Sequence, residues 1–419
     1  MKNQILLTTL LTAGVQLLAL EDNGITIIDQ KSPDFLLGKQ THINMKFTPY
    51  DNTEMWFKAG IRLQGTFESL NTKQYNLNGT TISNTTIEDA YLRRVRLEVA
   101  AGFGEHTSFV MDIRNDKSNK GIENDEGSFS AGDAYIKIKK PFNNSLINFK
   151  LYRAKIDVSR TETVKSARVI VYDRPYVADA AAQYISLNRR AANVQIYGNW
   201  KNKVHYQIAA GSATSPDKII DATGSKATAD GVSISDQSLF YGAKIILSPF
   251  DGWEETKRTE TYFAQGKHLS VGAAYWAVPT LAGTTATGAS FDLNRELINL
   301  EASAHYKGLF IQAEYFEFKD MVKDWTATNI ETGTSTGWYV TGEYVMPDLY
   351  YIAPFARYES WDRFDGSDGY EVTSTLAGVN WYLRGNTTKV GFVYQKDEYG
   401  VNTGNKDVTS IRITSQWFF

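Results

Sequence analysis

Short segments in which apolar and polar residues alternate one by one recur from about residue 55 to the end of this chain. The last ten residues, 410–419, are a clear case, because Ile411 and Ile413 share one face of an extended chain and Arg412 lies on the other. Successive side chains of a strand point to opposite faces, so each segment predicts a strand with one apolar and one polar face. Segments of about ten residues with this pattern are typical of strands that separate lipid from water.

We predict sixteen such strands, an even number, as bacterial barrels require. They lie at about 57–68, 91–101, 109–114, 133–139, 146–157, 192–200, 203–211, 238–248, 268–277, 296–307, 309–319, 337–346, 351–361, 371–384, 388–398 and 408–419. In the second segment the pattern places Tyr91 and Arg93 on the apolar face, opposite Arg94. In the fifth, Tyr152, Ala154 and Ile156 would face lipid.

The connections between these segments alternate in length. Short ones, such as 102–106 and 199–203, alternate with long polar ones at 69–88, 115–131, 158–190, 212–237, 278–295 and 320–336. Short periplasmic turns and long external loops are expected of a transmembrane barrel, whereas a soluble β-sandwich would not need this rhythm. One connection breaks it, because 249–267 should be a short turn and is long.

The amino-terminal residues predict export from the cytoplasm. Residues 1–20 combine Lys2 with an apolar run, which is typical of a signal peptide, and 21–54 would be a short periplasmic segment. The fold class is therefore all-β, with a transmembrane antiparallel β-barrel over 55–419 in the bacterial outer membrane. The chain has no Cys, which excludes disulfides, and its net charge of −3 argues against nucleic-acid binding.

A barrel of sixteen strands leaves an aqueous channel rather than a packed core, which predicts a diffusion channel for small hydrophilic solutes. The polar strand faces carry many basic residues, and an excess of them would favour anions. A charged strand face is also the ordinary solvated face, so a general non-selective channel stays open as an alternative. The candidate anion-pathway residues on the strands are Arg62, Arg94, Arg96, Arg114, Lys137, Lys139, Arg153 and Lys155.

The connection 158–190 follows the fifth predicted strand and is among the longest. It contains six basic and three acidic residues, an apolar run at 169–172 and a small-residue run at 178–182. An exposed loop gains nothing from those runs, so we expect this third external loop to fold back into the pore. Its basic residues would line a constriction that attracts anions, and they are Arg160, Lys165, Arg168, Arg174, Arg189 and Arg190.

The sequence resembles the phosphate-selective porins O and P in two stretches. Arg93-Arg-Val-Arg-Leu97 is similar to the family's Arg-Arg-Ala-Arg-Leu run, and Phe149 to Arg190 is similar to its fifth strand and constriction loop. Within the latter, Lys155 matches the Lys of a Gly-Gln-Phe-Lys segment, Ser166-Ala-Arg168 a Ser-Ser-Arg segment and Asp173-Arg174 a Glu-Arg pair. The terminal Phe419 also fits, since it resembles the assembly signal of outer-membrane barrels.

The resemblance implies a sixteen-stranded barrel, a homotrimer and an anion-preferring pore narrowed by the third external loop, with phosphate or polyphosphate as the candidate solute. This sequence departs from the family at Tyr152-Arg153-Ala154 and at Asp157-Val158. The permeant solute therefore stays open.

Other chemistry has little support in the sequence. The five His residues have no metal-ligand spacing, and no nucleotide-binding fingerprint occurs, so we expect no metal and no cofactor. His106 and Ser108 are two apart, loosely as in an outer-membrane phospholipase, but no acidic partner is evident. We therefore predict that the chain is not an enzyme, with a barrel enzyme or a mainly structural outer-membrane protein as the alternative.

Overall fold

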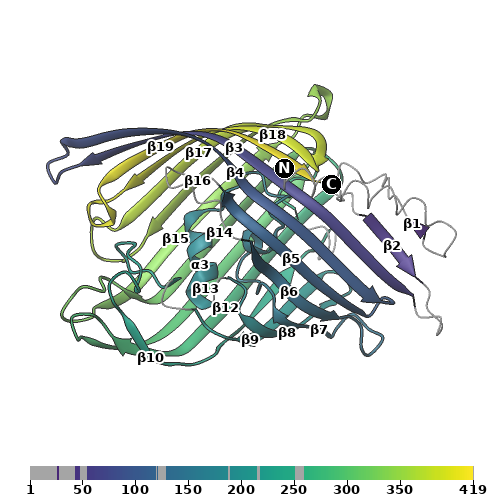
Figure 1. Ribbon diagram of the computed structural model, residues 1–419, viewed down its shortest axis with the longest axis horizontal. Coiled ribbons are helices and arrows are strands. Elements are labelled where there is room, and N and C mark those ends of the chain that lie inside the picture. Colours follow the sequence, from purple (N-terminus) through teal and green to yellow (C-terminus); the bar gives the residue numbers. More distant parts are fainter. Residues whose placement is uncertain are drawn as a thin grey trace, which may run out of the picture.

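The computed structural model describes residues 26–27, 43–47, 54–118, 120, 129–186, 189–214, 218–250 and 259–418. The predicted signal peptide 1–20, most of segment 21–54 and the terminal Phe419 lie outside these residues. Sixteen antiparallel strands close into a barrel, because the last strand, β19, pairs with the first barrel strand, β3 (Figure 1). The predicted all-β antiparallel barrel and its number of strands are confirmed.

The barrel strands are β3 (Met55–Tyr75), β4 (Thr81–Phe103), β5 (Thr107–Ser118), β6 (Ser130–Ile138), β7 (Asn148–Arg153), β8 (Ala192–Trp200), β9 (Val204–Gly211), β11 (Phe240–Leu247), β12 (Lys267–Thr284), β13 (Ser290–Tyr306), β14 (Leu309–Val322), β15 (Thr332–Tyr344), β16 (Ile352–Asp362), β17 (Glu371–Asn386), β18 (Thr388–Tyr399) and β19 (Lys406–Phe418). Three short strands add to the sheet. β1 (Thr26–Ile27) pairs with β2 (Ile43–Phe47), β2 pairs with β3, and β10 (Ser233–Gln237) continues the line of β11 along β12.

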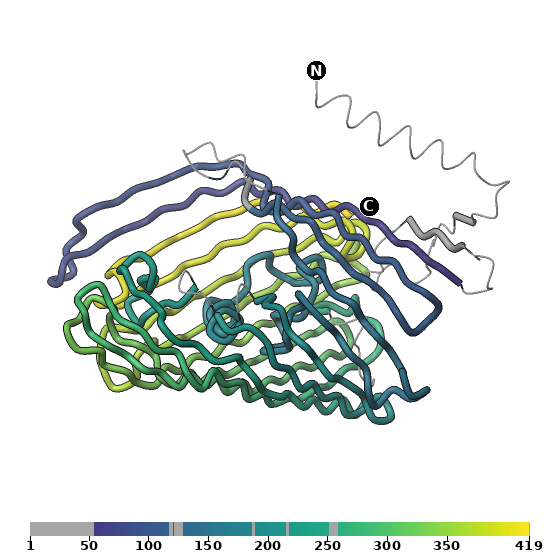
Figure 2. Tube along the Cα trace, turned by 60° about the horizontal axis from the view of Figure 1, so that its bottom comes forward, coloured from purple at the N-terminus to yellow at the C-terminus, as the bar shows by residue number. Residues whose placement is uncertain are grey.

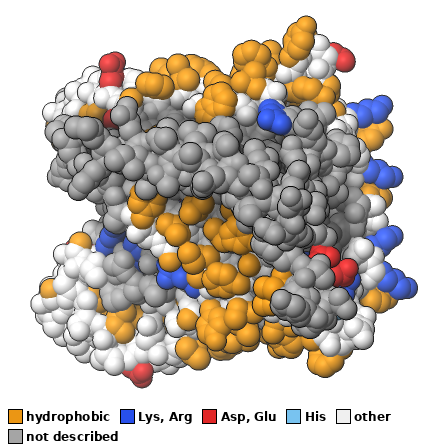
Figure 3. Space-filling model, turned by 45° about the vertical axis from the view of Figure 1, so that its right-hand side comes forward, with side chains coloured by type: hydrophobic (Ala, Val, Ile, Leu, Met, Phe, Trp, Pro, Cys, Tyr) orange, Lys and Arg blue, Asp and Glu red, His pale blue; other side chains and the backbone are white. Residues whose placement is uncertain are grey.

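Burial along the strands is the reverse of that in a soluble domain. On β19, Ile411 and Ile413 are exposed (45% and 53%), whereas Arg412 and Gln416 are buried inside the barrel (7% and 0%). Soluble proteins place apolar side chains inside and charged ones outside. Apolar side chains accordingly gather on the outer surface, as the face in Figure 3 illustrates. This arrangement suits a wall with lipid outside and polar groups within.

Several predicted external loops are shorter than the sequence indicated. The connection 69–88 is mostly strand, because β3 and β4 continue as a long hairpin that projects beyond the other strands (Figures 1 and 2). The same holds for 278–295, where β12 and β13 extend the pairing. The stretch 69–88 is mostly polar and lacks the one-sided alternation used to find strands. In 278–295, Leu281, Phe291 and Leu293 are buried inside (0%, 8% and 2%), so the apolar face there does not point to lipid.

A bulge in β4 corrects the predicted faces of two residues. Gln64 pairs with Arg94 and Gly65 with Leu92, so Arg93 is an extra residue relative to β3. An extra residue shifts the alternation by one position. As a result Tyr91 and Arg93 are buried inside the barrel (7% and 9%) rather than facing lipid.

The fifth barrel strand is also shorter than predicted. β7 ends at Arg153, and Tyr152 has a positive φ of 79°. This left-handed conformation, which is costly for a bulky residue, turns the chain off the wall. Ala154 and Ile156, expected to face lipid, are therefore buried at 1% each.

The segment between β7 and β8 contains two helices, α2 (Arg160–Thr163) and α3 (Tyr176–Ile185), and α3 lies within the ring of strands in both views (Figures 1 and 2). Helix α3 begins after Pro175, which suits the start of a helix, and its small residues Ala178, Ala181 and Ala182 pack against wall aromatics such as Trp276 and Phe316. Two 3-10 turns, η4 (Pro347–Leu349) and η5 (Val401–Thr403), lie between strands. No helix among the described residues is long and apolar enough to span a bilayer.

Candidate functional site

A cavity of about 1570 Å³ lies between strands β3–β6, strands β18 and β19, and segment 158–190. The described lining contains seventeen Lys and Arg side chains but ten Asp and Glu side chains. The described lining therefore carries an excess of seven positive charges. A narrow passage between low-dielectric walls focuses the field of its charges.

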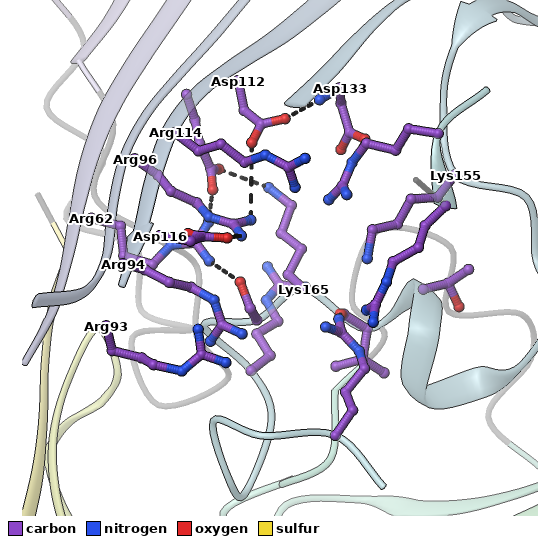
Figure 4. Close-up of a pocket in the computed structure, with 18 of the residues that line it drawn as sticks. Arg62, Arg93, Arg94, Arg96, Asp112, Arg114, Asp116, Asp133, Lys155 and Lys165 are labelled. Atoms are coloured by element: carbon purple, nitrogen blue, oxygen red, sulfur yellow. Dashed lines mark hydrogen bonds and ion pairs between the residues drawn. The ribbon is translucent and has the colours of Figure 1, made fainter. Parts of the chain in front are cut away.

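Strands β3 and β4 present a row of guanidinium groups to this cavity, and their neighbours fix them in place (Figure 4). Arg62 forms an ion pair with Glu98 and donates from Nη1 to the Ser166 hydroxyl at 2.6 Å. Arg94 donates from Nη1 to Oε1 of Gln64 at 2.9 Å and from Nη2 to the Tyr172 carbonyl at 3.1 Å. These contacts join the β3–β4 wall directly to segment 158–190.

Farther along the wall, Arg96 and Arg114 differ in how they are neutralised. Arg96 Nη2 lies 3.1 Å from Oδ2 of Asp116, and Arg96 Nη1 lies 3.9 Å from Asp112. Arg114 forms no ion pair with any described residue, and its guanidinium points into the cavity (Figure 4). Arg94 also forms no ion pair with a described residue, but it is 5% exposed and bonded to Gln64 and Tyr172. Arg114, on the neighbouring strand β5, is therefore the guanidinium best placed to meet a solute.

A buried carboxylate, Glu162 (1% exposed), contacts two cationic residues of segment 158–190 and Lys155, which precedes the segment. Its oxygens lie 2.8 Å from Lys155 Nζ, 3.2 Å from Arg189 Nη1 and 3.4 Å from Arg174 Nε. Burial alone would raise the pKa of the Glu162 carboxyl, but these three cations hold that pKa below its usual range. The ionised carboxylate therefore links three parts of the chain, at Lys155, Arg174 and Arg189.

Asp173 joins the same segment to two strands. Its carboxylate lies 2.6 Å from Arg93 Nη2 on β4 and 2.6 Å from Arg412 Nη1 on β19. Burial would raise the pKa of Asp173, yet the charges of Arg93 and Arg412 hold it well below its usual range. Asp173 neutralises much of the charge of both guanidinium groups, which leaves them less available to a solute.

The opposite half of the barrel is filled by side chains. Lys244 on β11 is buried between Asp157 at 2.9 Å and Glu301 at 2.5 Å. Wall carboxylates there accept backbone amides of the segment, from Thr161 to Glu314 at 2.9 Å and from Val177 to Glu359 at 2.6 Å. The segment therefore packs on the β9–β17 side and leaves the open space along β3–β6.

Twelve of the fourteen predicted pathway residues line the cavity, and they are Arg62, Arg94, Arg96, Arg114, Lys137, Lys139, Lys155, Lys165, Arg168, Arg174, Arg189 and Arg190. Arg153 and Arg160 lie elsewhere. Arg153 donates from Nε to the Gly132 carbonyl at 2.9 Å, and Arg160 is 1% exposed against the wall of the filled half. Placement in the lining is a geometric fact, while the role of each residue in conduction stays a prediction.

Five basic residues of the lining are outside the predicted set. Lys58 and Arg412 lie on strand faces that the alternation predicts to be polar, whereas Arg93, Lys120 and Lys218 were missed by the sequence reasoning. Arg93 is displaced by the bulge, and two adjacent arginines in an alternating strand are a signal that could have found it. Lys120 and Lys218 lie in connections predicted as external loops. Lys120 pairs with Glu68 on the lumen side of β3 at 2.9 Å. Polar loop sequence carries no periodicity that would place such a side chain.

Among the residues that the structure describes, no group of three or more His, Asp or Glu side chains is placed to hold a metal ion. His106, the candidate of the phospholipase-like pair, lies 3.0 Å from the Lys139 carbonyl through its Nδ1.

Comparison with known proteins agrees with this architecture. A family profile described as phosphate-selective porin O and P matches residues 57–419, nearly the whole barrel. An uncharacterized protein of Aquifex aeolicus (strain VF5) is 24% identical over 369 residues, which cover 79% of this chain and 81% of that protein.

Solved structures share the fold at low sequence identity. The anion-selective porin from Comamonas acidovorans has a TM-score of 0.54 at 9% identity, over 87% of this chain and 100% of that one. The outer membrane channel DcaP of Acinetobacter baumannii has a TM-score of 0.56 at 12% identity, over 87% of this chain and 97% of that one. At these identities the likeness concerns the fold alone.

Proposed function

The chain belongs to the phosphate-selective porin O and P family, and on that premise we propose that its cavity is an anion-preferring passage across the outer membrane. The family and the barrel fold indicate an outer-membrane channel rather than an enzyme. The observation that carries the anion preference is the excess of seventeen basic over ten acidic side chains in the described lining. Arg114, without an ion-pair partner among the described residues, would be a principal contact for passing anions.

Phosphate is the finer part of the proposal. Guanidinium groups bind phosphate oxygens through paired hydrogen bonds, which favours phosphate over chloride where several arginines converge. Arg96, Arg114 and Arg190 all line the cavity and offer such a set. The name of the family points the same way. A general non-selective porin is the alternative, since Asp112, Asp116 and Asp133 lie in the same lining.

Conductance in planar lipid bilayers tests the proposal with the purified, folded full chain. In a KCl gradient we expect a reversal potential of the sign that marks anion preference. Added inorganic phosphate should reduce the chloride current by occupying the arginine set. A cation-selective reversal potential would contradict the anion preference, and absence of phosphate block would contradict a phosphate-binding site. Absence of any conductance would contradict the channel function.

We also propose that 158–190 is the third external loop, that 1–20 is a signal peptide, and that the barrel assembles as a homotrimer. The packing of 158–190 against side chains of β3, β14 and β16 supports the first of these. The trimer rests on the resemblance to the family. The mass of the unheated, detergent-solubilised complex tests it, since a monomeric mass would contradict the trimer.

A further inference from the structure

The connection between β11 and β12, which the sequence left unexplained, packs inside the barrel at the end with the short turns. After the undescribed residues 251–258 it resumes at Thr259, and Thr259, Glu260, Thr261 and Phe263 are each 7% exposed or less. A connection that only linked two strands would stay at the surface. The burial indicates that this stretch, 259–263, supports something in the interior.

What it supports is segment 158–190. The Glu260 amide donates to the Arg168 carbonyl at 3.0 Å, and the Ile170 amide donates back to Glu260 Oε2 at 2.8 Å. The Thr161 hydroxyl donates to the other carboxylate oxygen, Oε1, at 2.9 Å. One residue of the turn thus holds the segment at three points.

The turn is itself fixed to the wall by aromatic contacts. The Tyr262 ring stacks against His268 of β12, with centroids 5.1 Å apart, and against His305 of β13, at 4.8 Å. Phe263 packs edge-on against Tyr382 of β17 at 5.0 Å. These contacts restrict the position of Glu260, so its hydrogen bonds in turn restrict the position of its partners in segment 158–190.

Those partners reach the passage through Arg168. Its carbonyl is the acceptor for the Glu260 amide, while its side chain belongs to the cavity lining. Lys389 of β18 donates from Nζ to the neighbouring Val169 and Ile170 carbonyls at 2.5 and 3.1 Å. Without the turn, the backbone near Arg168 would keep its hydrogen bonds to Lys389 on the wall. It would lose the hydrogen bonds that Glu260 makes with this segment.

We propose that Glu260 is a positioning residue of the anion passage, which holds the Arg168 stretch of segment 158–190 in place from the short-turn end of the barrel. The proposal rests on the proposed function, because it assigns to Glu260 a part in the anion preference.

The direction in which the anion-to-cation permeability ratio changes distinguishes a positioning role of Glu260 from an effect of its charge. Glu260→Gln removes the negative charge but keeps oxygen and nitrogen atoms that can bond to Ile170 and Thr161, so the anion-to-cation permeability ratio should stay level or rise. Glu260→Ala removes the same charge and both side-chain bonds, to Ile170 and Thr161, and leaves only the backbone bond to the Arg168 carbonyl. The ratio should fall by up to about threefold, the change expected when a unit charge about 6 Å from an ion's path in water is withdrawn from it. Asp348→Ala, an exposed carboxylate of another turn at the same end, is the control and should change nothing.

Single-channel recordings read only folded, inserted barrels, so reduced stability alone does not alter the ratio. In an Arg168→Gln background, Glu260→Ala should cause no further fall, because the two residues act in one unit. If Glu260→Ala yields no barrels, Thr161→Val removes one of the anchoring bonds and should lower the ratio, while Thr161→Ser keeps it.

Two failures can be told apart. A wild-type channel without anion preference overturns the proposed function and this role together. An anion-preferring wild type whose ratio is unchanged by Glu260→Ala, or lowered equally by Glu260→Gln, overturns the role of Glu260 alone. A further fall in the Arg168→Gln background also overturns it, since the effect would then pass through another residue.

Discussion

Arg114 and Arg94 are wall arginines that form no ion pair with a described residue, but Arg94 is buried (5% exposed) and bonded to Gln64 and the Tyr172 carbonyl, whereas Arg114 is partly exposed in the cavity. Its neighbour Arg96 lies 3.1 Å from Asp116, and Arg190 lies 2.6 Å from Asp133. A paired guanidinium presents little net charge to a passing ion, whereas an unpaired one presents its whole charge.

We therefore expect Arg114→Gln to reduce the anion-to-cation permeability ratio about threefold, since a unit charge at about 6 Å in water is worth about 0.7 kcal/mol. Reversal potentials in a KCl gradient measure the change. Arg384→Gln removes the same charge from an exposed position outside the lining and is the control. Equal shifts of the reversal potential in the two variants would mean that the net charge of the protein causes the change, and not the position of Arg114 in the passage.

For single residues, the sequence predicted the direction of some side chains and not of others. Alternation placed Arg62, Arg94 and Arg96 inside the barrel correctly, because strand geometry alone decides their direction. Arg93 was placed wrongly, because the bulge depends on the pairing partner, β3, and not on β4 itself. The ion-pair partner of each arginine depends on the tertiary structure, as when Asp173 pairs with both Arg93 and Arg412. No periodic pattern in the sequence predicts such a pair.

At the scale of elements, segment 158–190 owes its compact form to a buried charge cluster as well as to apolar packing. Glu162→Gln leaves Lys155 and Arg174 without their ion pair and leaves Arg189 with Asp179 alone. Breaking a buried ion pair costs about 3 kcal/mol or more, so the amides of 160–175 should lose hydrogen-exchange protection by an amount of that order. Glu331→Gln breaks an exposed pair with Lys323, which is worth about 1 kcal/mol or less, and serves as the control.

The same comparison has a defined pH dependence. Because the pKa of Glu162 is lowered in the folded chain, its stabilising effect is complete above the ordinary pKa of Glu, about 4.3, and is lost as the pH falls from there towards the folded value. The difference in protection between wild type and Glu162→Gln should be constant from about pH 8 to 5.5 and smaller at about pH 4. A difference that shrinks between pH 8 and 6 would contradict a lowered pKa.

Whole elements could be predicted where lipid imposes a one-sided pattern, and less well elsewhere. β8 runs from Ala192 to Trp200, the range that the alternation predicted. The hairpin of β3 and β4 beyond residue 69 and the inward turn at 259–263 were missed. The hairpin sequence is mostly polar and 259–263 is buried inside the barrel, so neither shows the regular apolar alternation by which strands were predicted.

At the scale of the whole molecule, the barrel interior has two unlike halves. Along β9–β17, helix α3 and the turn at 259–263 pack against aromatic and polar wall residues. Along β3–β6, charged side chains surround open space. A regular barrel would offer the same access to every inward-facing side chain, so the asymmetry comes from the side on which segment 158–190 packs.

This asymmetry predicts which inward-facing positions solutes can reach. The chain has no Cys, so a single introduced Cys can be followed without background. Ser108 on β5 lines the cavity, and Ser303 on β13 points inward in the filled half at 3% exposure. A negatively charged thiol reagent should react with Ser108→Cys and lower the conductance, while Ser303→Cys should stay unmodified until the barrel is unfolded. Rapid reaction at position 303 would contradict the filled half and place a second route through the barrel.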